Sequence, residues 1–124
     1  MLYVRDLERM KRFYGDLLEV EPTNQNWTSI WSTFDAGGVR FALHAIPAEI
    51  AQDFEIADHA APRENAPVKL IFEVKNVEGE RERLESLGVR TIRRSWQKPG
   101  DACDAVDPEG NVFQLCSSGA DAPV

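Results

Sequence analysis

The sequence predicts an α+β fold of two βαβββ modules that form a cupped mixed sheet around a central cavity. Residues 4–20, VRDLERMKRFYGDLLEV, resemble residues 74–90, VKNVEGERERLESLGVR, position by position. Near each copy the apolar spacing changes from alternation, typical of strands, to three and four, typical of helices. We expect a single domain of 124 residues. Its repeats are 1–46 and 68–118, joined by an acidic connection, 47–67.

The first module is predicted to run strand, helix and then three strands. Asp6 is an expected N-cap, because a short side-chain acceptor satisfies the first free N–H groups of a helix. The helix is indicated by an apolar stripe at Leu7, Met10, Phe13, Tyr14, Leu17 and Leu18. The expected strands are 2–4, a weak one at 20–21, 27–34 and 39–46, the last two joined by the turn 35–38.

The connection 47–67 carries prolines at both ends and in the middle, and it is longer than most loops. A short helix at Glu49–Phe54 is expected in it. His59 lies in its polar part and is predicted to be solvated.

The second module repeats the first. Asn76 is the expected N-cap of a helix that runs to Leu87 and ends at Gly88. The expected strands are 68–74, 89–94, 102–106 and 112–117, with a turn at 107–111. The tail, 118–124, is predicted to fray.

Composition excludes several classes. The net charge of −7 disfavours nucleic acid as a partner. No apolar run approaches a membrane span, and no signal peptide begins the sequence, so the cytoplasm is expected. Two cysteines make no disulfide framework. Cys103 and Cys116 lie symmetrically about 109–110, so a simple hairpin places them opposite one another as thiols.

Two segments resemble a known family. MLYVRDLERMKRFYGDLL (1–18) is similar to the opening of the vicinal oxygen chelate superfamily, and DPEGNVFQL (107–115) to its closing turn and strand. The superfamily contains glyoxalase I, bleomycin-resistance proteins, extradiol dioxygenases and fosfomycin-inactivating enzymes. The resemblance implies the glyoxalase/bleomycin-resistance fold. In the family's enzymes a divalent metal on the inner sheet face stabilises negative charge that develops on a chelating substrate.

Carried onto this sequence, the family's metal ligands are incomplete. The first position falls two residues before Met1, and the second falls on Ala42, with His44 one inward position further. The third falls on Lys69, whose ammonium has no lone pair, and the fourth on Gln114. His44 and Gln114, joined by Cys116, are therefore weak metal candidates. No cofactor is expected, and a divalent metal is the open alternative.

Strand parity, anchored on the family pattern, predicts which side chains face the cavity. The inward residues are Tyr3, Ala42, His44, Lys69, Ile71, Glu73, Val112, Gln114 and Cys116. The expected ligand-binding residues are Tyr3, Trp31, His44, Lys69, Ile71, Glu73, Trp96, Gln114 and Cys116.

Several of these residues have two interpretations. Trp27, Trp31 and Trp96 stack on a planar ligand or belong to the core or a dimer contact. Lys69 pairs with Glu73 or binds an anionic group of the ligand.

The predicted function is binding of a small organic molecule, for sequestration or sensing, without a complete metal site. One alternative is a divalent-metal-dependent lyase, transferase or dioxygenase whose first ligand precedes Met1. Another is a non-enzymatic partner subunit that pairs through its sheet edges. The first strand is short beside its counterpart 68–74, so we expect residues upstream of Met1 in the natural protein.

A homodimer is predicted, because open four-stranded sheets leave edges that need covering. Sedimentation at micromolar concentration should show twice the chain mass of 13.9 kDa. A stable species of single-chain mass contradicts this prediction.

Overall fold

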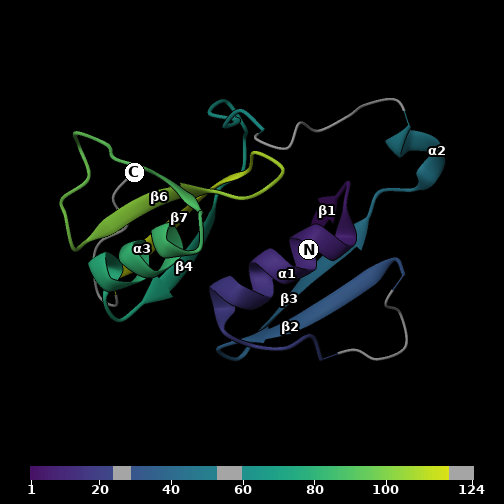
Figure 1. The fold of residues 1–124 in the computed structure, drawn as a ribbon, viewed down its shortest axis with the longest axis horizontal. Coiled ribbons are helices and arrows are strands. Elements are labelled where there is room, and N and C mark those ends of the chain that lie inside the picture. The colour runs from purple at the N-terminus through teal and green to yellow at the C-terminus, as the bar shows by residue number, and fades with distance from the viewer. Residues whose placement is uncertain (24–28, 53–59, 118–124) are drawn as a thin grey trace. The chain divides into compact units, whose positions relative to one another are not determined.

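The computed structural model describes residues 1–23, 29–52 and 60–117 (Figure 1). It divides into two units, Met1–Ala60 and Ala61–Val124. The boundary falls inside the predicted connection, and that the two units form a single domain stays a prediction. Trp27 and His59 lie outside the described residues, as does the tail at 118–124.

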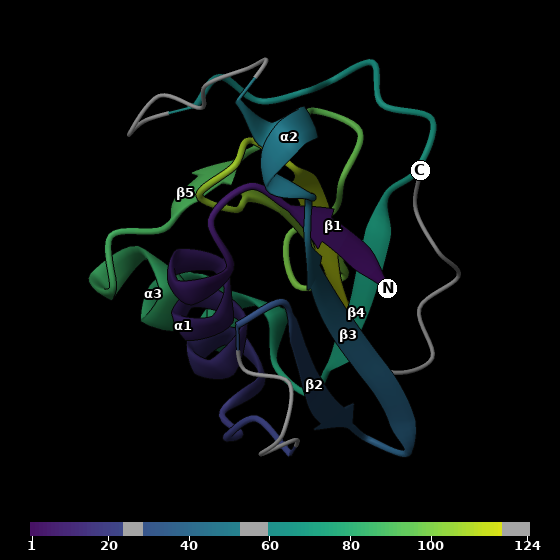
Figure 2. The ribbon, with the colours of Figure 1, turned by 90° about the vertical axis from the view of Figure 1, so that its right-hand side faces the viewer.

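Unit 1 is a three-stranded mixed sheet with a helix on one face (Figure 2). Its elements are β1 (Leu2–Val4), α1 (Leu7–Leu18), β2 (Trp31–Ala36), β3 (Val39–Ala45) and the short α2 (Ala48–Ala51). The strand order is β1-β3-β2. β1 runs parallel to β3, and β2 runs antiparallel to it.

Helix α1 forms where its cap and apolar stripe predict. The Asp6 carboxylate accepts a hydrogen bond from the backbone N–H of Arg9 at 3.1 Å. Met10 and Tyr14 are fully buried, and the Tyr14 ring lies 5.0 Å from that of Phe41 on β3. This contact identifies the sheet face that α1 covers. The helix ends at Glu19, in the left-handed region with φ 56°.

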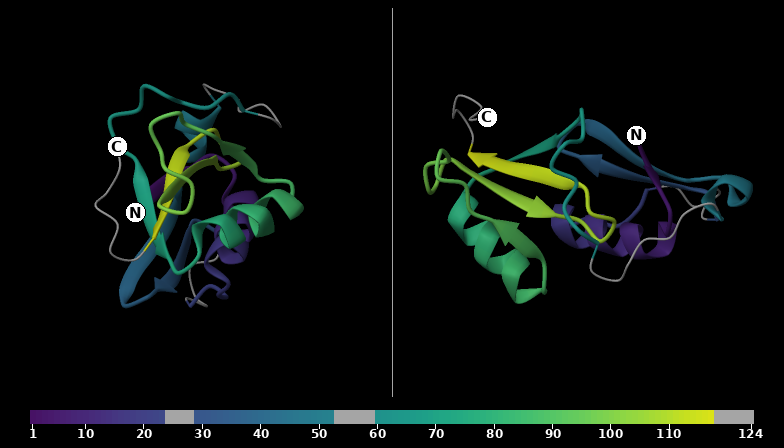
Figure 3. Two further views of the ribbon diagram at one scale, coloured as in Figure 1. Left: turned by 90° about the vertical axis from the view of Figure 1, so that its left-hand side faces the viewer. Right: turned by 90° about the horizontal axis from the view of Figure 1, so that it is seen from above.

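Unit 2 is a four-stranded mixed sheet, again with a helix on one face (Figure 3). Its elements are β4 (Leu70–Val74), α3 (Val77–Ser86), β5 (Arg90–Ile92), β6 (Ala102–Val106) and β7 (Val112–Ser117). The strand order is β4-β7-β6-β5, with β4 parallel to β7 and the other pairs antiparallel.

Helix α3 is capped in the same way as α1. The Asn76 side chain accepts from the N–H of Gly79 at 3.0 Å. Glycine is suited to position 79, because a Cβ there would lie 2.7 Å from the Asn76 amide nitrogen. Val77 and Leu84 bury the inner side of α3. The chain leaves the helix at Gly88, whose φ of +84° favours glycine.

The structure corrects several predicted elements. Residues 20–21 form no strand, and the segment instead joins β2 where the Thr23 N–H donates to the Thr33 carbonyl at 2.8 Å. Unit 1 therefore has two described strands after α1 rather than three. The helix expected at 49–54 is Ala48–Ala51, and residues 53–54 of that prediction lie outside the described residues.

Several strand bounds differ from those predicted. The strand expected at 27–34 is Trp31–Ala36, so it starts later and extends into the expected turn 35–38. β4 starts at Leu70 rather than Val68, which is 72% exposed. β5 stops at Ile92 rather than Arg94, because Arg94 turns towards β6 and its guanidinium bonds to Asp104. After Ile92, the side-chain bond of Arg94 to Asp104 therefore takes the place of backbone pairing between β5 and β6.

The predicted opposition of the two cysteines is wrong. Cys103 pairs with Leu115 in the β6–β7 register, and Cys116 pairs with Ala102, so the thiols lie on opposite faces of the sheet. The loop 107–111 shifts the register, because the Asp107 carboxylate accepts from the N–H groups of both Glu109 and Asn111 at 2.9 Å. Both cysteines are buried and free.

None of the helices in the described part of the chain is long and apolar enough to cross a membrane.

Replacing Asn76 by Ala should lower the free energy of unfolding by about 1 kcal/mol, because the Gly79 N–H loses its acceptor. Asn76→Asp keeps an acceptor and should stay close to the parent protein. Urea unfolding measures both. Equal stabilities for the Ala and Asp variants would contradict the role of this cap.

Candidate functional site

Each unit has one sheet face covered by its helix and one face turned away from it. In unit 1, the contact of Phe41 with Tyr14 places Phe41 on the α1 side. Alternation along β3 then places Ala42 and His44 on the opposite face. The register brings Tyr3 of β1 beside His44 on this face. The facing predicted from strand parity therefore agrees with the structure of unit 1.

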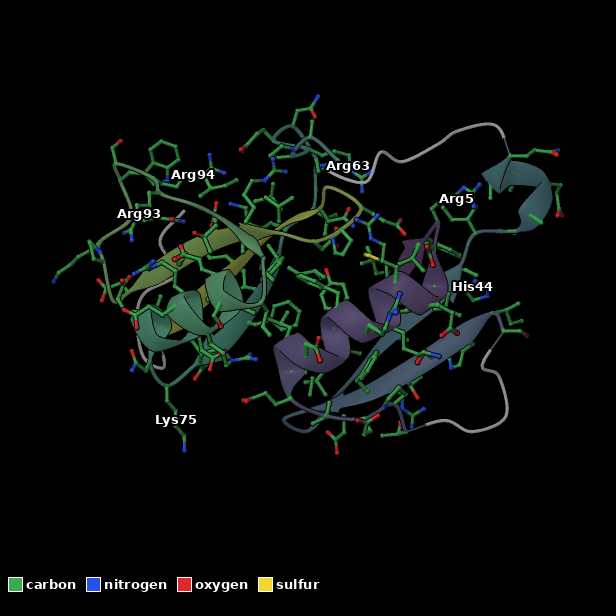
Figure 4. All side chains as sticks on the ribbon, in the orientation of Figure 1. Arg5, His44, Arg63, Lys75, Arg93 and Arg94 are labelled. Atoms are coloured by element: carbon green, nitrogen blue, oxygen red, sulfur yellow. The ribbon has the colours of Figure 1, made fainter. Side chains whose placement is uncertain are left out.

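An aromatic row crosses this face of unit 1. The Tyr3 ring lies 5.3 Å from the His44 ring, and the Trp31 ring lies 5.7 Å from it on the other side, edge-on. His44 is marked in Figure 4, on β3. Tyr3 is 57% exposed, and Trp31 and His44 are half-buried. The row is thus an accessible aromatic surface.

His44 has an orientation that sets its chemistry. Its Nδ1 lies 2.7 Å from the carbonyl oxygen of Ala45. A carbonyl only accepts, so the proton is on Nδ1, and in neutral His44 the other nitrogen, Nε2, carries a lone pair. The row can therefore stack on an apolar ring and accept one hydrogen bond.

In unit 2 the face turned away from α3 is polar. Cys103 faces the helix, since the charges of Arg81 and Glu78 on α3 act on its thiol. The neighbouring position Asp104 then faces the other way, and the register sets Gln114 beside Asp104 and Ile71 beside Gln114. Glu73 and Cys116 are paired on the same face.

A buried carboxylate is at the centre of this face. Asp104 is 0% exposed. Its Oδ2 accepts from Lys69 Nζ at 3.0 Å and from Arg94 Nε at 3.1 Å. Its Oδ1 accepts from Gln97 Nε2 at 2.9 Å. We call Asp104, Lys69, Arg94 and Gln97 the Asp104 network.

The network meets the physical requirement for burying a charge. An ionised carboxylate taken out of water is costly unless it is paired and its lone pairs are used. Here two cations and one amide donor do this. Arg94 is 14% exposed at its side chain, whereas Lys69 is 38% exposed. The Lys69 side chain therefore remains partly accessible, whereas that of Arg94 is mostly buried.

The loop between β5 and β6 lies over the network. Arg94 Nη2 donates to Glu64 Oε2 at 2.7 Å, and its Cζ lies 5.6 Å from the centre of the Trp96 ring. Trp96 is 64% exposed. Hydrogen bonding to Glu64 first, and to Asp104, raises the pKa of Arg94 against the opposing effect of burial. The guanidinium is thus charged and oriented.

The sequence-based interpretation of Lys69 missed its partner. Glu73 and a ligand anion were considered, but the structure pairs Lys69 with Asp104. Asp104, Arg94 and Gln97 were all missed as site residues. A signal was present: Asp104 is the one charge in ACDAV, a strand with apolar residues on either side. Counting outward from the 107–111 turn also places Asp104 on the same sheet face as Gln114.

The remaining predicted site residues are placed as follows. Ile71 is 49% exposed, and Gln114 is 1% exposed. Burial raises the pKa of the Cys116 thiol, and the charge of Glu73 raises it further. Cys116 is therefore a neutral thiol at neutral pH and a poor nucleophile. Ligand binding by the predicted residues stays a prediction.

The residues at the family's metal positions in unit 2 do not fit a divalent cation. The ammonium of Lys69 repels a cation and already bonds to Asp104. The neighbouring Gln114 supplies only a neutral oxygen or an amide. Within residues 1–23, 29–52 and 60–117, no three His, Cys, Asp or Glu side chains gather closely enough to hold a metal ion.

Replacing Asp104 by Asn should lower the free energy of unfolding by about 3 kcal/mol, because Lys69 and Arg94 lose their shared anion. Asp101→Asn makes the same charge change at a half-buried position of the same hairpin, and should stay within about 0.5 kcal/mol. Thermal or urea unfolding compares the two variants. Equal losses would show that the network is not what stabilises this face.

Comparisons with known proteins agree with this architecture. The family model described as a glyoxalase-like domain matches residues 1–116. Comparison with curated protein sequences gave no match.

Solved structures share the fold at low identity. The fosfomycin resistance protein FosX from Listeria monocytogenes, complexed with Mn(II) and sulfate, is 17% identical, with a TM-score of 0.66 over 94% of this chain and 85% of that one. Lactoylglutathione lyase from Agrobacterium tumefaciens is 20% identical, with a TM-score of 0.64 over 94% and 89%. A bleomycin-binding protein complexed with bleomycin is 16% identical, with a TM-score of 0.63 over 94% and 93%. The chain belongs to the glyoxalase-like domain family, and it shares the fold of these solved structures.

Proposed function

We propose that this protein binds a small organic molecule through its own side chains, without a resident metal. The observation that carries the proposal is the ion pair of Lys69 with the buried Asp104. It occupies the position where the family pattern implies a metal-ligating histidine. A lysine held by a carboxylate offers a ligand N–H donors and positive charge, which is binding chemistry.

Two accessible surfaces support binding. In unit 1, the row of Tyr3, His44 and Trp31 offers aromatic faces and one acceptor nitrogen. In unit 2, Ile71 and Trp96 are large apolar side chains that are 49% and 64% exposed. Mostly apolar surfaces with a few oriented polar groups are typical of small-molecule sites. A bleomycin-binding protein of this fold, complexed with bleomycin, is a precedent for small-molecule binding in another protein.

We also propose that the protein acts as a cytoplasmic homodimer, in sequestration or sensing. The competing function is a metal-dependent enzyme whose first ligand precedes Met1. The structure of FosX with Mn(II) gives that alternative its precedent. The two functions differ in what the purified protein should contain.

Elemental analysis of the purified protein should find manganese, iron and zinc well below one equivalent per chain. Mn²⁺ and Zn²⁺ should leave the melting temperature unchanged, whereas some members of a panel of organic acids, aromatic compounds and amines should raise it. Tightly held stoichiometric metal would contradict the proposal and favour the enzyme.

A variant pair ties binding to the face turned away from α3. Lys69→Met keeps the stem of the side chain and removes its charge, and should reduce the shift caused by an active compound. Lys75→Met makes the same change at an exposed position after β4, and should leave that shift unchanged. Equal shifts in both variants would show that the ligand binds elsewhere.

A further inference from the structure

We propose that Arg94 is an oxyanion receptor for an aromatic acid, and that the Glu64 carboxylate occupies this receptor until the ligand displaces it. The inference deepens the proposed function and rests on it, because it names the ligand class of the unit 2 face. The inference rests on a difference between the two carboxylates that bond to Arg94: one is fixed and the other is replaceable.

One anion is fixed. Asp104 is fully buried and bonds to Nε of Arg94 at 3.1 Å, with Lys69 and Gln97 holding the same carboxylate. The Cζ of Arg94 also lies over the ring of Trp96, 5.6 Å from its centre. An arginine held by a buried carboxylate at Nε and placed over an aromatic ring is pre-organised, so little entropy is lost when its other donors bind.

The other anion is replaceable. Glu64 reaches Nη2 of Arg94 at 2.7 Å, but its side chain is 52% exposed. An exposed ion pair contributes little to stability. The segment does not depend on it, because the Arg63 N–H donates to the Gly110 carbonyl at 2.9 Å and its guanidinium to Asn111. Figure 4 shows Arg63 near the turn that joins β6 to β7. Glu64 can therefore leave while its neighbour stays anchored.

The charges around Arg94 determine which kind of group can replace Glu64. Lys69 and Arg94 both bond to Oδ2 of Asp104, so the two cationic heads are neighbours. With Glu64 in place, two cations face two carboxylates. When Glu64 leaves, one positive charge is uncompensated, and a carboxylate from a ligand restores the balance through a charge-assisted hydrogen bond.

The aromatic part of the ligand follows from Trp96. Its indole is 64% exposed although one side packs on Arg94. Ile71, on the sheet face that carries the Asp104 network, is 49% exposed. A flat apolar ring that stacks on the indole removes the exposed face of Trp96 from water while its carboxylate reaches Arg94. A planar aromatic acid combines the two features.

The experiment titrates the protein with 1-naphthoate and, as the uncharged comparison, 1-naphthamide. Binding is followed by the NMR signal of the Trp96 indole N–H, assigned with Trp96→Phe. The expected result is saturable binding of naphthoate that shifts this signal, and much weaker binding of the amide. Absence of naphthoate binding, or equal binding of the amide, overturns the inference.

The variants test the displacement. Glu64→Gln should tighten naphthoate binding by about two- to fivefold, because the competing ion pair is lost. Glu82→Gln makes the same charge change on α3, where Glu82 is 73% exposed, and should change nothing. Equal affinity in both variants, or tighter binding in both, overturns the role of Glu64.

The receptor itself is tested by two further variants. Arg94→Lys should weaken naphthoate binding by about tenfold, the effect of one lost charge-assisted hydrogen bond. Trp96→Ala, at a mostly exposed position, should weaken it by about two- to tenfold and leave folding intact. Unchanged affinity in Trp96→Ala overturns the inference even if Arg94→Lys unfolds. Metal content and thermal shifts with other compounds still test the proposed function. Failure of the aromatic-acid inference can therefore be distinguished from failure of the proposed function.

Discussion

The charge on Asp104 is the constraint around which unit 2 is organised. A fully buried carboxylate must be paired, and here its partners come from two places in the chain. Lys69 comes from the residue before β4, and Arg94 and Gln97 come from the loop between β5 and β6. One side chain in the middle of β6 therefore fixes the entry to one strand and the path of a loop. This is also why β5 ends early.

The two units share a plan and differ in what they present. Each begins with a strand, a short side-chain cap at Asp6 or Asn76, and a helix that buries one sheet face. The repeated features are those that stabilise the helix and its contact with the sheet. The opposite faces differ, since unit 1 carries the aromatic row around His44 and unit 2 carries the Asp104 network. The two units therefore share a scaffold but present different faces.

Membership of the glyoxalase-like family establishes the scaffold and leaves the chemistry to the side chains. At the position where the family pattern implies a metal ligand, this chain has a lysine already bound to a carboxylate. Because Lys69 and Arg94 share the one carboxylate of Asp104, we propose that the second cation makes this face suitable for a negatively charged ligand. Glu64 shows that a carboxylate fits beside Arg94.

The sequence alone determined the two helices, their caps and most of the strands, because these depend on local spacing and parity. Asp6, Asn76 and Gly88 act where local rules place them. Ala102–Val106 and Val112–Ser117 are the strands that the pattern predicts.

Only the tertiary structure decided which charges meet. Asp104 and Lys69 are separated by 35 positions, and Arg94 and Glu64 by 30, so no local pattern pairs them. The register of Cys103 and Cys116 was likewise set by hydrogen bonds inside the 107–111 turn, which symmetry of spacing does not reveal. Pairing across a sheet depends on how the loops fold, and that is settled by the packing of the whole unit.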